Sequence, residues 1–155
     1  MPDYIVETIG ETPYLYATGE SSMDPAAISA AMGECYGRVV AFMESHGIPP
    51  AGPALSVYHT YDPEVMRFQA GIIVSSEAIM DPGADVKGDI LPAGRVLSFT
   101  HVGPYATLRD DYADMMSYVE REGLKLSSPA WEVYIDDPKD TPEAELRTKV
   151  HVALE

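Results

Sequence analysis

The sequence contains one unit twice. The segment from Tyr36 to Tyr58 (YGRVVAFMESHGIPPAGPALSVY) aligns without a gap with the segment from Tyr112 to Tyr134 (YADMMSYVEREGLKLSSPAWEVY), 76 residues later. Seven aligned pairs are identical, and both segments pass from a helical apolar pattern through a glycine and a proline-bearing loop to a strand-like run. An internal repeat of this kind predicts two halves that share one supersecondary structure.

Each half contains one predicted helix. Asp24 is a good N-cap followed by Pro25 at the first helical position, and Gly47 is placed to end the helix in a left-handed conformation. In the second half we expect Pro104 to open the helix and Gly123 to end it. Apolar residues recur at spacings of three and four in both helices and form one stripe on each. The stripes are Ile28, Met32, Cys35, Val39 and Phe42 in the first helix, and Tyr105, Leu108, Tyr112, Met115 and Val119 in the second.

Strand-like runs surround the two helices in the same order. They are predicted over residues 13–19, 54–61 and 68–74 in the first half, and over 95–101, 130–135 and 149–154 in the second, with short additional strands at 4–8 and 85–90. The expected fold class is therefore α+β: two β-α-β-β modules with antiparallel sheets and two long helices. We expect the repeats at about 1–77 and 85–155, joined by a connector at 78–88, to pack as a single domain of 155 residues.

Charge and composition limit the partners and the location of the chain. The net charge is −15, whereas a nucleic-acid binder needs a basic surface, so we expect no direct binding of DNA or RNA. No run of about 20 apolar residues predicts a membrane span, and the acidic N-terminus is unlike a signal peptide. The single cysteine, Cys35, excludes an internal disulfide, so a cytoplasmic location is expected.

Glu132 is the anomalous residue of the second half. Alternation along its strand predicts two faces, which are Trp131, Val133 and Ile135 on one and Ala130, Glu132 and Tyr134 on the other. We expect the purely apolar face to pack on the helix of its own half. A buried carboxylate is costly unless it is paired, and the equivalent residue of the first half is the small Ser56. The alternative is that Glu132 is solvated or pairs with Arg95 or Arg147.

The repeat also predicts where these residues meet. A pseudo-twofold axis between the halves would bring Ser56, Tyr58, Glu132 and Tyr134 around one central space. The chain has ten tyrosines, whose rings either fill the core or line a cleft that attracts a flat cation. The sequence therefore favours a central ligand cleft with Glu132 as its polar anchor.

Other chemistry finds little support in the sequence. No two of the four histidines have the spacing of metal ligands on a helix, so no metal site is expected. The chain has no phosphate-binding loop, dinucleotide fingerprint or nucleophile elbow, and we expect no cofactor. His101 precedes a Gly-Pro-Tyr sequence at a strand end, where we expect a capping or edge residue that could also touch a ligand.

The residues from Phe99 to Leu154 resemble the GyrI-like family, which also supplies the effector-binding domain of AraC-type and MerR-type multidrug-responsive regulators. The matching motifs are HVGPY (101–105), SPAWEVYIDDP (128–138) and TPEAELRTKVHVAL (141–154), and GPALSVYHTYDPE (52–64) matches in the first half. The resemblance implies two β-α-β-β modules about a pseudo-twofold axis with a ligand cleft between them. It also implies that Glu132 lies in that cleft and recognises cationic or polarised organic molecules.

The resemblance implies three functions. We expect a free-standing copy that sequesters or senses small, largely apolar or cationic compounds. One alternative is a hydrolase that opens strained cyclopropane rings, with Glu132 and Tyr134 as catalytic residues; the other is a protein that protects gyrase by contact. The expected ligand contacts are Glu132, Tyr134, Ser56, Tyr58, Trp131, Tyr105 and His101.

Overall fold

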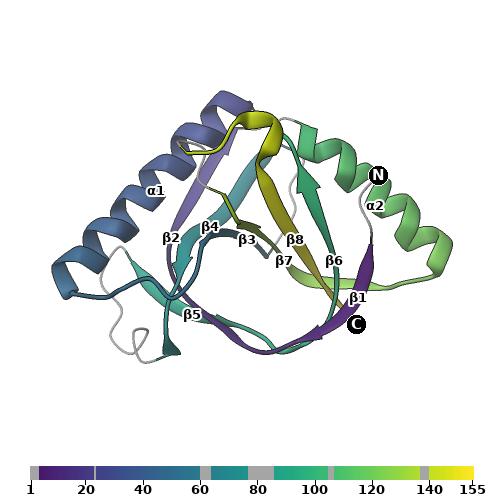
Figure 1. The fold of residues 1–155 in the computed structure, drawn as a ribbon, viewed down its shortest axis with the longest axis horizontal. Coiled ribbons are helices and arrows are strands. Elements are labelled where there is room, and N and C mark those ends of the chain that lie inside the picture. Colours follow the sequence, from purple (N-terminus) through teal and green to yellow (C-terminus); the bar gives the residue numbers. More distant parts are fainter. Residues whose placement is uncertain (1–3, 23, 60–63, 77–85, 105–106, 137–139) are drawn as a thin grey trace. The chain divides into compact units, whose positions relative to one another are not determined.

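A computed structural model describes residues 4–22, 24–59, 64–76, 86–104, 107–136 and 140–155 (Figure 1). It divides into two compact units, which we name after their helices. The α1 unit is Gly10–Ala93, and the α2 unit combines Met1–Ile9 with Gly94–Glu155. In its described residues each unit has one long helix and four antiparallel strands, which confirms the predicted α+β fold class. The pseudo-twofold axis and the cleft between the halves stay predictions.

The α1 unit contains the first predicted β-α-β-β order. Strand β4 pairs with β3 on one side and with β2 on the other, and β2 also pairs with β5, so the order is β3-β4-β2-β5. The elements are β2 (Thr12–Ser22), α1 (Pro25–His46), β3 (Ala54–Tyr58), β4 (Val65–Ile73) and β5 (Lys87–Leu91).

The α2 unit repeats this strand order. Strand β8 pairs with β7 and β6, and β6 also pairs with β1, which gives the order β7-β8-β6-β1. The elements are β1 (Ile5–Ile9), β6 (Gly94–Val102), α2 (Leu108–Glu122), β7 (Leu126–Tyr134), a short 3-10 helix η3 (Glu143–Glu145) and β8 (Arg147–Leu154). Each unit therefore has the predicted β-α-β-β order plus one edge strand, and the N-terminal strand β1 is the edge of the α2 unit.

Both helices end at the predicted glycines. Gly47 and Gly123 have φ values of 65° and 66°, in the left-handed region that costs glycine little. At the start of α1 the Asp24 carboxylate accepts a hydrogen bond from the Ala27 N–H at 3.4 Å, as expected for an N-cap. Neither helix of the described residues is both long and apolar enough to cross a bilayer.

Helix α2 begins later than predicted. Pro104 lies outside the regular helix, which starts at Leu108 with Thr107 as its N-cap, and the Pro104 carbonyl accepts a hydrogen bond from the Thr107 N–H at 3.1 Å. The predicted stripe is confirmed at Leu108, Met115 and Val119, which are buried against strands of the α2 unit. Tyr105, predicted on the same stripe, lies outside the described residues.

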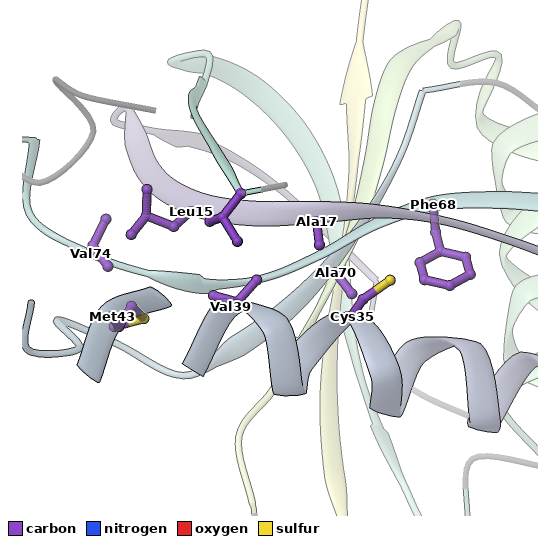
Figure 2. Close-up of a cluster of buried hydrophobic side chains, with 9 residues drawn as sticks. Leu15, Ala17, Cys35, Val39, Met43, Phe68, Ala70 and Val74 are labelled. Atoms are coloured by element: carbon purple, nitrogen blue, oxygen red, sulfur yellow. The ribbon is translucent and has the colours of Figure 1, made fainter. Parts of the chain in front are cut away.

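The core of the α1 unit lies between α1 and its sheet. Cys35, Val39 and Met43 point from the helix toward side chains of β2 and β4 (Figure 2). Gly71 on β4 lets two strands approach closely, because a Cβ there would lie 1.9 Å from the Leu15 carbonyl oxygen. Cys35, the single cysteine of the sequence, is buried in this core, as its place on the predicted stripe indicates.

The prediction of which strand face meets the helix is wrong in both units. Ala130 packs against the α2 core cluster, and Glu132 is bonded to α2, so the mixed face of β7 is the helix-facing one. In the α1 unit Ser56 likewise contacts α1 residues, and Tyr58 packs against the α1 core cluster. Alternation defines two faces, but both faces of these strands are largely buried, so polarity does not identify the one that the helix covers.

Candidate functional site

Glu132 lies on β7 with its side chain toward α2 and only 7% of its surface exposed. The Tyr112 hydroxyl, on α2, donates to Glu132 Oε2 at 2.6 Å. The Tyr134 hydroxyl, two residues along β7, donates to Oε1 at 2.9 Å. Each carboxylate oxygen thus accepts one phenol and keeps further acceptor capacity.

The surroundings of Glu132 favour its neutral form relative to water. Burial raises the pKa of the Glu132 carboxyl, while the hydrogen bonds from Tyr112 and Tyr134 and the charge of His101 lower it, and burial is the largest effect. A carboxyl of this kind gains most when a positive charge arrives beside it, because burial limits the solvation of its ionised form.

The alternative of an arginine partner is not realised in the part of the chain that the structure describes. Arg147 instead makes a two-pronged contact with Asp136, at 2.9 Å and 3.0 Å, on the exposed side of the strand. No lysine or arginine of the described residues lies within ion-pair distance of Glu132. Among the residues that the structure describes, the side chains hydrogen-bonded to Glu132 are those of Tyr112 and Tyr134.

His101 lies on the same sheet face as Glu132, and it is buried rather than an edge residue. In the β6-β8-β7 register it stands opposite Thr148, which stands opposite Tyr134. Its Nδ1 contacts the Asp111 carboxylate of α2, and its Nε2 lies 2.9 Å from the Pro104 carbonyl oxygen. Both ring nitrogens therefore face acceptors, and the ring ties the first turn of α2 to β6.

Ser56 occupies the position in the α1 unit that Glu132 occupies in the α2 unit. It is buried, and its hydroxyl lies 3.0 Å from that of Tyr36, which also donates to the Leu55 carbonyl at 3.0 Å. Tyr58, the equivalent of Tyr134, packs against the α1 core cluster. The expected gathering of these residues with Glu132 and Tyr134 around one space stays a prediction.

Trp131 points away from Glu132, on the opposite face of β7. It is 2% exposed, and its ring stacks on that of His151 with centroids 5.2 Å apart. Burial and the charge of Lys149 lower the pKa of His151 to about 4, against a smaller opposing effect of Glu7. A ligand that touches Glu132 from the α2 side would therefore not meet the indole of Trp131 directly.

Tyr112 was predicted on the apolar stripe of the second helix and not as a residue of the site. A signal was present, because Tyr112 precedes Glu132 by the same interval that separates Tyr36 from Ser56, and both tyrosines are conserved between the repeats. In both units this tyrosine places its hydroxyl on the strand residue that differs. The repeat thus has a constant phenol and a variable partner.

Known structures resemble this fold over nearly its whole length. The crystal structure of the EcmrR C-terminal domain matches with a TM-score of 0.79 and 21% identity, covering 100% of this chain and 98% of that one. The structure of SAV2435 bound to tetraphenylphosphonium matches at 0.67 and 11%, covering 99% and 94%. A hydrolase from Listeria innocua matches at 0.66 and 15%, covering 99% and 92%. At these identities the likeness establishes the fold.

A comparison with curated proteins gave no match. Residues 2–155 match the family model of the GyrI-like small molecule binding domain. The likeness to the EcmrR C-terminal domain agrees with this assignment in fold. The chain therefore belongs to the GyrI-like family of small-molecule-binding domains.

Proposed function

We propose that this domain binds largely apolar organic cations, in a sequestering or sensing role, with the Glu132 carboxylate opposite the positive charge of the ligand. The observation that carries the proposal is a buried carboxylate bonded to two neutral phenols, with no lysine or arginine within ion-pair distance among the described residues. The family to which the chain belongs is one of small-molecule-binding domains.

Electrostatics favours a cation over a neutral or anionic ligand. The pKa of Glu132 is raised by burial, so the free protein holds a carboxyl whose ionised form is poorly stabilised. A cation beside it would stabilise that form, and a charge pair in a place without water is worth more than one at the surface. The rings of Tyr112 and Tyr134 add faces on which a cation is also favourable.

Tetraphenylphosphonium is a suitable probe for this proposal. SAV2435, which shares this fold, is described as bound to tetraphenylphosphonium, an apolar cation whose charge does not change with pH. We expect this ion to bind the present domain, with an affinity measured by isothermal titration calorimetry.

The test compares two substitutions that change the net charge equally. Glu132→Gln should weaken tetraphenylphosphonium binding at least tenfold, a change of about 1.4 kcal/mol. Glu122→Gln, which removes an exposed carboxylate at the end of α2, should leave the affinity within about twofold, since exposed charges contribute little. Equal affinities of the wild type and Glu132→Gln would refute the assigned role of Glu132.

Hydrolysis is a second candidate, supported by the Glu132–Tyr134 contact at 2.9 Å. A carboxylate of raised pKa is a better general base toward water, and a phenol beside it could donate a proton to the group that leaves. Incubation with a cyclopropane-bearing alkylator and mass analysis of the products tests this. A water adduct formed by the wild type and absent with Glu132→Gln would support it, and retention of the intact compound without product would exclude it.

A further inference from the structure

Thr148 carries a buried hydroxyl without a hydrogen-bond partner in the described part of the chain. Its side chain is 0% exposed, on strand β8 of the α2 unit. Leaving such a group unsatisfied costs about 1–3 kcal/mol, and native structures retain few of them. A role in ligand binding would explain why this unsatisfied hydroxyl is retained.

The place of Thr148 in the sheet distinguishes it from similar atoms. Two other buried side-chain atoms lack partners among the described residues, Arg38 Nε in the α1 unit and His151 Nδ1. His151 is on the sheet face that Trp131 shares, opposite to Glu132. Thr148 alternates with Val150 and Val152, which belong to the α2 core cluster, so it lies on the Glu132 face.

Thr148 is a close neighbour of the carboxylate. It stands directly opposite Tyr134, while Glu132 stands opposite Val150, so Thr148 and Glu132 are diagonal neighbours on adjacent strands. Such pairs have Cα atoms about 7–8 Å apart and Cβ atoms somewhat closer. An ammonium group has three N–H donors, each reaching an acceptor at about 2.9 Å, so one group between the two side chains can contact both.

The polar neighbours of Thr148 are already engaged. The two ring nitrogens of His101 contact Asp111 and Pro104, and the Tyr134 hydroxyl donates to Glu132. The Thr148 hydroxyl therefore has no hydrogen-bond partner among the described residues, although it lies on the Glu132 face beside polar side chains that are bonded elsewhere.

We propose that Thr148 is a second polar contact of the Glu132 site and selects cations that carry N–H groups over fully alkylated or arylated ones. This inference rests on the proposed function. The Thr148 oxygen would accept an N–H of a protonated amine or amidine while Glu132 balances its charge. A quaternary ion offers no donor and would leave the hydroxyl unsatisfied.

The experiment uses two ligands that differ in their N–H groups: 1-naphthylmethylammonium and the corresponding trimethylammonium ion, titrated by calorimetry at neutral pH. Thr148→Val, which replaces the hydroxyl with a methyl group of similar volume, should weaken the primary ammonium about tenfold and the trimethylammonium less than about twofold. Thr148→Ser keeps the hydroxyl and should retain the selectivity of the wild type. The melting temperature of Thr148→Val should equal or exceed that of the wild type, because an unsatisfied group is removed.

The outcomes separate this inference from the proposed function. If Glu132→Gln weakens both ligands and Thr148→Val weakens neither, or both equally, the role of Thr148 is overturned and that of Glu132 stands. If Glu132→Gln changes neither affinity, the proposed function fails. A large fall in the melting temperature of Thr148→Val would show that the hydroxyl is satisfied, and would also overturn the inference.

Discussion

The Tyr112 hydroxyl donates a 2.6 Å hydrogen bond to the Glu132 carboxylate and so links helix α2 to strand β7. In the α1 unit the Tyr36 and Ser56 hydroxyls lie 3.0 Å apart at the equivalent positions, where Tyr36 donates to the Leu55 carbonyl. The repeat thus supplies a phenol from the helix to the first strand after it, twice. Where the strand residue is serine the contact is neutral, and where it is glutamate the phenol is bonded to the carboxyl that we propose faces the cation.

Removal of the Tyr112 hydroxyl should change the pH dependence of cation binding. This hydrogen bond lowers the pKa of Glu132, so Tyr112→Phe should raise that pKa further. Because the ionised carboxylate binds the cation, the pH at which tetraphenylphosphonium affinity falls to half should move upward. The matched variant Tyr36→Phe, in the other unit, should lose about 1 kcal/mol of stability and leave that midpoint unchanged. Identical midpoints for the two variants would contradict the assignment.

Glu132→Gln should stabilise the free protein at neutral pH. The pKa of Glu132 in the folded state is raised above its ordinary value of 4.5, so ionisation costs the folded state stability. This cost is complete above the folded pKa and absent below pH 4.5. The melting temperature of Glu132→Gln should therefore exceed that of the wild type at neutral pH, and the difference should shrink on acidification. A lower melting temperature of the variant at neutral pH would count against a carboxylate whose ionised form is destabilised by burial.

His151 should make the fold sensitive to acid. Its pKa is about 4 in the folded protein against an ordinary value of 6.5, because of burial and the charge of Lys149. The stability associated with neutral His151 is present above pH 6.5 and is lost as the pH falls toward 4. The free energy of unfolding should fall by on the order of 3 kcal/mol across this range.

The contribution of His151 can be isolated by substitution. His151→Phe keeps a ring to stack on Trp131 but does not titrate, so urea unfolding of this variant should depend less on pH between 6.5 and 4. Glu132 titrates with the opposite sign, since its protonation favours the folded state, and it contributes equally to both proteins. Parallel pH profiles for the wild type and the variant would argue against a buried neutral His151.

Gly71→Ala should disrupt the sheet of the α1 unit. The added Cβ would lie 1.9 Å from the Leu15 carbonyl oxygen, and backbone atoms on both strands would have to shift. We expect a loss of about 2–4 kcal/mol in the free energy of unfolding. Gly37→Ala is the control: it lies within α1, where the new Cβ would have no atom within 4 Å beyond its chain neighbours and the helix backbone, and it should gain about 1 kcal/mol from helix propensity. Equal stabilities of the two variants would refute the close strand approach.

The element order could be predicted because it depends on local signals. Asp24 and Gly47 define α1 by the chemistry of caps, and the predicted apolar stripe, which includes the buried Cys35 and Val39, has helical spacing. The start of α2 could not be predicted in the same way, since a proline at the first helical position and a proline in a preceding turn have the same sequence signature. In the structure Pro104 precedes the regular helix, which starts at Leu108, and its carbonyl accepts the Thr107 N–H.

The site could be predicted in part. The contrast between Ser56 and Glu132 identified the residue that differs between the repeats, and Tyr134 was correctly placed on its face. The contact with Tyr112 depends on which face of β7 the helix covers. Trp131 and Ala130 are both compatible with burial, so the strand alone does not decide this. Likewise no pattern in the sequence shows that the Thr148 hydroxyl lacks a partner, because that depends on where the neighbouring polar groups point.

In the proposed function, Glu132 makes this domain selective for positive charge. Tetraphenylphosphonium and tetraphenylborate have nearly the same shape and opposite charge, so their affinities in a sodium buffer measure charge preference directly. We predict that the wild type and Glu122→Gln prefer the cation by at least about tenfold, and that Glu132→Gln loses most of this preference. A Glu132→Gln protein that retained the full preference of the wild type would contradict the assigned role of Glu132, because the selectivity would then come from the overall charge of −15.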